Sequence, residues 1–146
     1  MHLLTAQTVL DVIAGEPRVA AWMANVPQVH ISAIALALAE QTIHGSGRND
    51  PRHAALVSAF ATLRGAVNAF GRIEPFDGSA ALTWAKLLNL RPPLEIDNGT
   101  AREPLDDLAM MDVAIAIERR LLLVERSQPY HSVVGQSFIF GTVSPY

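Results

Sequence analysis

The stretch from Leu105 to Ser127, which reads LDDLAMMDVAIAIERRLLLVERS, constrains the fold of this chain more than any other segment. From Leu108 to Ile117 nearly every residue is apolar and Asp112 is the one charge, a pattern typical of a helix buried on most of its surface. The aliphatic run Leu121–Val124 then predicts a buried parallel strand. A buried helix followed by a buried strand belongs in the middle of an α/β domain, and a site is expected near the ends of such strands.

The composition indicates one ordered domain spanning residues 1–146. Of the 146 residues 50% are hydrophobic and 17% are charged, which argues against disorder. There is no cysteine, so disulfides and thiolate metal sites are excluded. No apolar run reaches the ~20 residues of a membrane span, and the first residues lack the basic start of a signal peptide. We therefore expect a cytoplasmic protein with no membrane partner. The net charge of −3 gives no overall attraction for nucleic acid.

Short strands and helices alternate along the chain. Besides Leu121–Val124, extended segments are predicted at Leu3-Leu4, Val29–Ala33, Arg72–Phe76 and Ser137–Phe140. Besides the helix of the opening stretch, helices are predicted at Thr8–Ile13, from Pro17 through Met23, from Ser32 to about His44, at about Arg52–Phe70 and from Asp77 to about Leu90. This alternation predicts a three-layer α/β/α domain with a short, mainly parallel central sheet.

Local signals suggest where helices start and which faces they bury. Asp50 and Pro51 are placed to cap and start the helix that follows them, and Asp77 is placed to cap the next one. The residues of that next helix expected to point inward are Leu82, Ala85, Leu88 and Leu90. The segment Arg91–Glu103, rich in Pro, Gly and charge, is expected to be a mobile loop.

Five segments, in order and without large gaps, match the pattern of a known family. Leu4–Leu10 (LTAQTVL) stands where the family has LLDTNVL, and Pro17–Leu38 parallels a helix, a strand and a helix start reading SAITxAEL. Gly71–Leu87 resembles GRILPFD…A…YA, Leu105–Ser127 lies over (I/A)xxADxxIAATA…LxLVTRN, and Ser144–Tyr146 resembles NPW. The chain thus resembles, over nearly its whole length, the PIN-domain ribonucleases of the VapC and FitB toxin type. The resemblance implies a PIN-like fold.

The resemblance also implies a metal site, which this sequence does not supply. In the family, clustered carboxylates bind Mg²⁺ or Mn²⁺ and so activate water for RNA cleavage. In a gapless alignment the four acid positions fall on Ala6, Leu38, Ala109 and Ser127, none of which is acidic. Such side chains do not bind a hard divalent ion. We therefore expect no catalytic residue, no metal and no cofactor at the positions that the family uses.

Five other acids are fallback candidates for a relocated cluster: Asp11, Asp106, Asp107, Asp112 and Glu125. Asp106 and Asp107 are also explained as acids of a first helical turn, where they cap the helix or complement its dipole. Asp112 is harder to explain, since it lies inside the most apolar helix. A short gap after Ile117 lays it on the Asp of the family's DxxIA. Otherwise it is a hydrogen-bonded or ion-paired structural group, with Arg126 as its candidate partner.

Three hypotheses follow from these residues. The first is a degenerate, VapC-like pseudoenzyme that has lost Mg²⁺-dependent cleavage and acts by binding itself, an antitoxin-like protein or RNA. The helices around Val19–Met23 and Leu56–Phe60 would then supply homodimer or partner surfaces. The second is an active Mg²⁺- or Mn²⁺-dependent endoribonuclease toxin with a relocated acid cluster. The third is a small-ligand binder that uses the neutralised pocket around Ala6, Leu38 and Ala109. An RNA-facing patch would draw on Arg64, Arg72, Arg119, Arg120 and Arg126.

Overall fold

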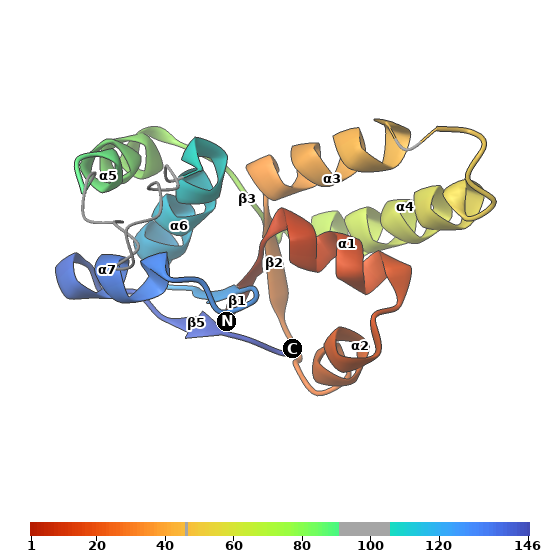
Figure 1. Ribbon diagram of the computed structural model, residues 1–146, viewed down its shortest axis with the longest axis horizontal. Coiled ribbons are helices and arrows are strands. Elements are labelled where there is room, and N and C mark those ends of the chain that lie inside the picture. Colours follow the sequence, from red (N-terminus) through yellow and green to blue (C-terminus); the bar gives the residue numbers. More distant parts are fainter. Residues whose placement is uncertain (46, 91–105) are drawn as a thin grey trace, which may run out of the picture.

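The described part of the chain, residues 1–45, 47–90 and 106–146 of the computed structural model, contains a parallel sheet covered on both faces by helices (Figure 1). The strands follow the order β3-β2-β1-β4-β5, and each neighbouring pair is parallel. They are β1 (His2–Leu4), β2 (Val29–Ser32), β3 (Ile73–Glu74), β4 (Leu122–Val124) and β5 (Thr142–Val143). The predicted α/β architecture with a short parallel sheet is confirmed. The loop predicted at Arg91–Glu103 lies outside the described residues.

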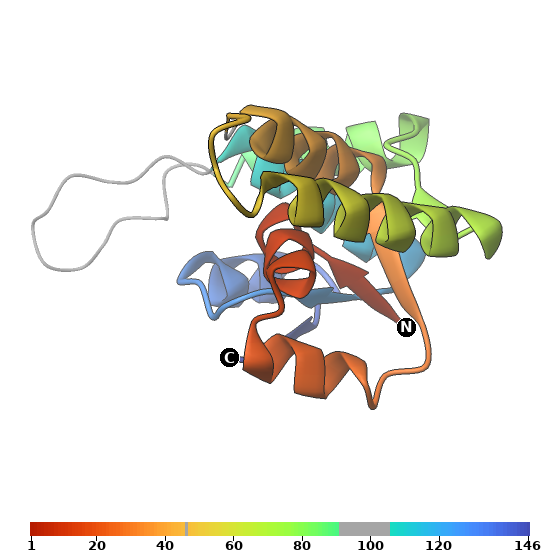
Figure 2. The same cartoon turned by 90° about the vertical axis from the view of Figure 1, so that its right-hand side faces the viewer.

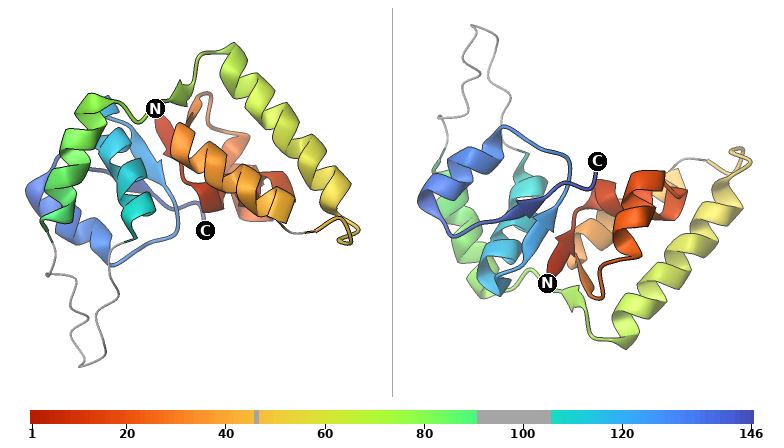
Figure 3. Two further views of the ribbon diagram at one scale, coloured as in Figure 1. Left: turned by 90° about the horizontal axis from the view of Figure 1, so that it is seen from above. Right: turned by 90° about the horizontal axis from the view of Figure 1, so that it is seen from below.

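The helices form the two outer layers. One face of the sheet carries α1 (Ala6–Ala14), α2 (Pro17–Met23), α3 (Ala33–Gly45) and α4 (His53–Ala69). The other carries α5 (Gly78–Leu88), α6 (Asp107–Arg119) and α7 (Tyr130–Ser137). Within the layers α3 lies along α4 (Figure 2) and α5 lies along α6 (Figure 3). None of these helices is long and apolar enough to cross a membrane.

The pleat of the strands divides the core in two. Successive side chains of a strand point to opposite faces of a sheet. Leu3 therefore packs with α5, α6 and α7, while Leu4 packs with α1, α3 and α4. Leu123 and Val124 of the neighbouring strand divide in the same way. The aliphatic strands are thus buried on both sides, as expected of strands in a doubly covered parallel sheet.

Hydrogen-bonding side chains start the helices at the ends of the strands. Thr5 caps α1 and accepts a hydrogen bond from the Thr8 N–H, and Gly15 ends that helix with a φ of 74°. Ser32 accepts a 2.8 Å bond from the Ala35 N–H, which confirms it as the residue that starts α3. Asp77 caps α5, also as predicted.

Two predictions about helix ends and faces are wrong. The helix α4 begins at His53, and Asp50 instead accepts a bond from the Arg52 N–H in the turn before it. In α5 the buried residues are Ala80, Thr83 and Leu87, while Leu82 and Ala85 are exposed. The rotation of α5 about its own axis explains the difference, because the side of α5 that carries Thr83 packs against α6. The prediction considered only how apolar each residue is, and it therefore placed Leu82 inward and not the polar Thr83.

The last predicted strand is also misplaced. Tyr130–Ser137 is the helix α7, so Ser137 ends a helix, and Phe138–Phe140 is a connection rather than a strand. The ladder with β4 begins two residues later, at Thr142. Phe138 and Phe140 do alternate inward, as strand residues would, but they pack against the core without a neighbouring strand.

The apolar stripes assigned to partner surfaces belong to the core instead. Val19 and Phe60 are buried, and Trp22, Met23 and Leu56 pack against the cluster beneath α3 and α4. Within residues 1–45, 47–90 and 106–146, the exposed large apolar side chains lie elsewhere, at Met1, Phe70, Leu82, Leu108, Leu122 and Ile139.

The C-terminus of α6 offers a test of backbone strain. Arg120 adopts a φ of 54°, in the left-handed region that favours glycine. We expect Arg120→Gly to raise the free energy of unfolding by about 0.5–1 kcal/mol, or the melting temperature by about 2–4 °C. The matched variant Arg119→Gly should lower it, because Arg119 is helical and ion-paired. Equal melting temperatures for both variants would contradict this explanation.

Candidate functional site at the carboxyl ends of the strands

Polar residues gather where the central strands end. Thr5 follows β1, Ser32 is the last residue of β2, and Glu125 follows β4. Because parallel strands all end at the same edge of a sheet, these three side chains lie along one rim. Asp112, on the helix α6, joins this rim through its hydrogen bond with Ser32.

Asp112 is buried against the end of β2. Asp112 is only 3% exposed, and its Oδ1 accepts a short hydrogen bond from the Ser32 hydroxyl. Since the same hydroxyl oxygen accepts the Ala35 N–H, one serine links β2, α3 and α6. The partner proposed from the sequence, Arg126, is wrong: its guanidinium lies 3.9 Å from the ring centre of Tyr146.

Burial dominates the electrostatics of Asp112. Loss of hydration raises the pKa of its carboxyl group from 3.8 to about 7, and the nearby charges of Glu125 and Asp106 act in the same direction. The bond from Ser32 opposes this rise only in part. Near neutral pH, Asp112 is therefore divided between a neutral acid and a carboxylate.

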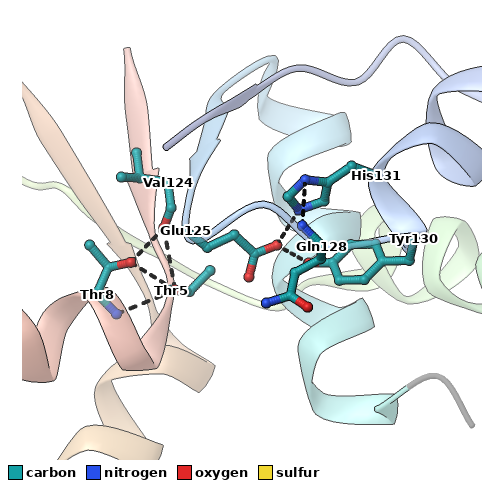
Figure 4. Close-up of polar contacts among 7 residues, drawn as sticks. All are labelled: Thr5, Thr8, Val124, Glu125, Gln128, Tyr130 and His131. Carbon is teal, nitrogen blue, oxygen red and sulfur yellow. Dashed lines mark hydrogen bonds and ion pairs between the residues drawn. The ribbon is translucent and has the colours of Figure 1, made fainter. Parts of the chain in front are cut away.

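Glu125 is held by the first turn of α7 (Figure 4). Its Oε1 accepts a short bond from the Tyr130 hydroxyl and another, 2.6 Å long, from Nε2 of His131. The Nδ1 of His131 faces the Gln128 N–H at 3.4 Å, which fixes Nε2 as the donor toward Glu125. Burial, followed by the Glu125 charge, raises the pKa of Tyr130. This carboxylate therefore fastens α7 to the end of β4.

Two threonines lie beside the end of β1, Thr5 directly after the strand and Thr8 in the first turn of α1 (Figure 4). The hydroxyls of Thr5 and Thr8 both donate to the carbonyl oxygen of Val124, at 3.3 and 2.7 Å, and lie 3.1 Å from each other. Both residues are buried. Neutral hydroxyl–carbonyl bonds thus join the ends of β1 and β4. They lie next in sequence to Ala6, where the family has its first acid.

The fallback acids differ in their partners and in their burial. Asp106 is the exposed N-cap of α6 and accepts the Leu108 N–H. Asp107 is exposed in the first turn of that helix. Asp11 accepts bonds from Gln7 and from the Tyr146 hydroxyl at 2.5 Å, and burial with this bond raises the pKa of Tyr146 to about 12. Only Asp112 and Glu125 combine burial with a place at the strand ends.

The four family positions carry no group that replaces the acids. Ala6 begins α1, Leu38 lies on α3 and Ala109 lies on α6, and all three are partly buried. Ser127 is exposed in the turn after β4. Among the residues that the structure describes, no three His, Asp or Glu side chains are grouped so that they could bind one metal ion. The donor set therefore does not fit the divalent ions of the family.

Four of the five arginines proposed for an RNA-facing patch contact other side chains, and Arg120 is exposed at the C-terminus of α6. Arg119 bridges Glu74 and Asp77, at 3.5 and 2.6 Å. Arg64 approaches Glu40, and Arg72 lies over the ring of Phe70. These contacts come from separate helices and loops on different sides of the sheet.

Several solved structures share the fold of this chain. FitAB bound to the IR36 DNA fragment matches 99% of this chain and 95% of its own, at 19% identity and a TM-score of 0.74. FitAcB from Neisseria gonorrhoeae matches 99% and 98% of the two chains, at 19% identity and a TM-score of 0.69. The fold is that of a VapC/FitB-type PIN domain. VapBC2 from Rickettsia felis, bound to a promoter DNA fragment, has the same PIN fold at 15% identity, with 98% and 97% coverage and a TM-score of 0.63. No protein-family model and no curated protein matches the sequence.

Sequence reasoning missed the polar partners at this PIN rim. Ser32 was recognised only as the residue at which a helix starts, and Thr5, Thr8, Tyr130 and His131 were not singled out as polar partners. One signal was available: the polar residue that follows each of three apolar strands marks the edge where those strands end.

The ionisation of Asp112 makes stability depend on pH. Between its unfolded pKa of 3.8 and its native pKa of about 7, the native state retains a proton that the unfolded state has lost. Stability from this group is therefore present at pH 4 and is lost as the pH rises to about 7. We expect the wild type to lose stability relative to Asp112→Asn across this range, as measured by urea unfolding. A difference between the two that is constant with pH would contradict the assignment, and Asp107→Asn controls for loss of a carboxylate as such.

Removal of the Tyr130 hydroxyl tests the attachment of α7. A hydrogen bond to a charged group contributes about 1.5–3 kcal/mol. Tyr130→Phe should therefore accelerate amide exchange in α7 by at least about tenfold, as measured by mass spectrometry. Tyr146→Phe, which removes another hydroxyl–carboxylate bond, should leave α7 unchanged. Acceleration of α7 by both variants would show general loosening instead.

Proposed function

We propose that this chain is a degenerate, single-domain PIN-type protein of the cytoplasm. It does not catalyse Mg²⁺-dependent RNA cleavage, and it acts by binding a protein partner. The observation that carries the proposal is the state of the strand ends, where hydroxyl–carbonyl and hydrogen-bonded carboxyl groups stand in place of a carboxylate cluster.

The two remaining acids are poor ligands for a hydrated divalent ion. Asp112 is committed to Ser32 and is partly protonated near neutral pH. Glu125 is committed to Tyr130 and His131 through Oε1. A metal ion would have to displace these hydrogen-bond partners. It would also lose hydration in a buried setting, which is costly unless enough opposite charge surrounds it. Both carboxyl groups are therefore better explained as cross-links between a helix and the sheet.

An antitoxin-like protein is the partner that the fold supports best. The similar structures are of FitAB and VapBC2 complexes, and another is of a toxin–antitoxin complex from Klebsiella pneumoniae. Loss of the acids at the strand ends need not affect the outer faces of the helices. We propose that this chain retains such a partner after its metal chemistry has gone. RNA binding has no comparable support, because four of the five candidate arginines contact other side chains of this chain.

Thermal melting with Mg²⁺ or Mn²⁺ tests the proposal. A metal present at a hundred times its dissociation constant stabilises the native state by about 2.7 kcal/mol. We expect no such stabilisation, and no metal-dependent cleavage of single-stranded RNA.

The rival hypothesis, an active endoribonuclease with a relocated cluster, makes the opposite prediction. A rise in melting temperature that Asp112→Asn or Glu125→Gln abolishes, together with RNA cleavage lost in the same variants, would establish it and overturn our proposal. Asp50→Asn serves as the matched control, because Asp50 lies in the turn before α4 and is not one of the fallback acids.

A further inference from the structure

Two histidines lie close together between the end of α3 and the start of α4. His44 is in the last turn of α3, and His53 is the first residue of α4, which runs back along α3 (Figure 2). Their ring centres are 6.4 Å apart, and the ring planes are inclined by 68°. Their spacing in the sequence is not that of neighbours on one helix face. The turn between the two helices is what brings the two rings together.

The nitrogen atoms of this pair are only weakly engaged by other groups. Nδ1 of His53 is buried and has no hydrogen-bond partner among the residues that the structure describes. Nε2 of His44 lies 3.8 Å from the carboxylate of Glu40, one turn earlier on α3, which is too long for a hydrogen bond. The His44 side chain is 59% exposed, so its ring can turn without disturbing the core. A buried nitrogen without a partner is costly, and a bound ion would offset that cost.

The separation of the two rings suits a shared metal ion. An imidazole nitrogen binds Zn²⁺ at about 2.0–2.1 Å, so two rings that share one ion have their centres roughly 4.5–6.5 Å apart. The observed separation lies at the upper end of that range. Neutral imidazole is a good ligand for Zn²⁺, Ni²⁺ and Cu²⁺, whereas Mg²⁺ prefers oxygen ligands. The pair therefore matches a borderline divalent ion and not the hard ions of the nuclease family.

We propose that His44 and His53 bind a borderline divalent metal ion of the Zn²⁺, Ni²⁺ and Cu²⁺ group, which bridges the end of α3 and the start of α4. Within the part of the chain that the structure describes, no third His, Asp or Glu is already grouped with them. Two imidazoles therefore bind the ion, and water or an external ligand fills its other positions. Glu40 adds negative charge beside the site, although Arg64 also lies 3.8 Å from the same carboxylate.

This site is separate from the strand ends and does not depend on the function proposed above. The helix α3 starts beside Ser32, at the end of β2, and His44 lies roughly 18 Å further along it at 1.5 Å per residue. Loss of Mg²⁺ chemistry at the strand ends has no bearing on two imidazoles at the other end of this helix. The two proposals can therefore fail separately.

Isothermal titration calorimetry of the untagged chain with Zn²⁺ tests the site. We expect saturable binding of one ion per chain. Loss of a group that only orients a metal ligand lowers affinity about 10–100-fold, so His44→Ala and His53→Ala should each weaken binding at least about tenfold. Because His44 is exposed, its variant should keep the circular dichroism spectrum of the wild type. His2→Ala, which removes a histidine of β1, is the matched control and should bind Zn²⁺ as the wild type does.

Hydrogen exchange supplies a second readout. Zn²⁺ should slow amide exchange in the last turn of α3 and the first turn of α4 and leave α7 unchanged, and excess Mg²⁺ should not reverse the effect. The proposal is overturned if the wild type binds no Zn²⁺, or if His44→Ala binds it as tightly as the wild type. It is also overturned if binding is lost in His2→Ala, which would place the ion at the N-terminus, or in Asp112→Asn, which would place it at the strand ends.

Discussion

The packing of α6 against the sheet brings a carboxyl group to a place that water barely reaches. Met110 and Val113–Ala116 fill the space between that helix, α5 and the strands, and Asp112 is carried inward with them. A buried acid requires a partner or a proton. Ser32 provides a hydrogen-bond partner for Asp112. The raised pKa of Asp112 means that part of the population keeps the proton near neutral pH. The positions of β2, α3 and α6 therefore all depend on how this one group is satisfied.

On the function proposed above, the strand ends would be a case of a fold that keeps its architecture without its metal chemistry. In a metal-dependent nuclease, a cation offsets the repulsion among acids drawn from separate elements. Here the hydroxyls of Thr5 and Thr8 bond to the Val124 carbonyl and so join the ends of β1 and β4. Glu125, which follows β4, accepts a bond from Tyr130 and so joins that strand to α7. Each of these bonds joins segments that the fold must bring together whether or not a metal binds. These bonds therefore make the ends of the strands part of the scaffold.

The sequence was sufficient to predict the sheet, the order of most elements and several helix caps, because those follow from apolar periodicity and local hydrogen bonding. It failed where the outcome depended on tertiary contacts. Phe138 and Phe140 have the alternation of a strand, yet their neighbours are side chains of the core and not a ladder. Leu82 is exposed because α5 turns Thr83 toward Glu118 of α6, 2.5 Å away. The partner of Asp112 likewise came from a strand 80 positions away along the chain.

The strand order has a consequence for folding. The central strand β1 lies between β2 and β4, and Thr8 reaches the Val124 carbonyl across 116 positions of sequence. Contacts this far apart are slow to form, because a long loop must close before any of them can stabilise the chain. During synthesis, one side of β1 therefore stays open until most of the chain has emerged. A chaperone that binds short aliphatic segments would have Leu3 and Leu4 within reach during that interval.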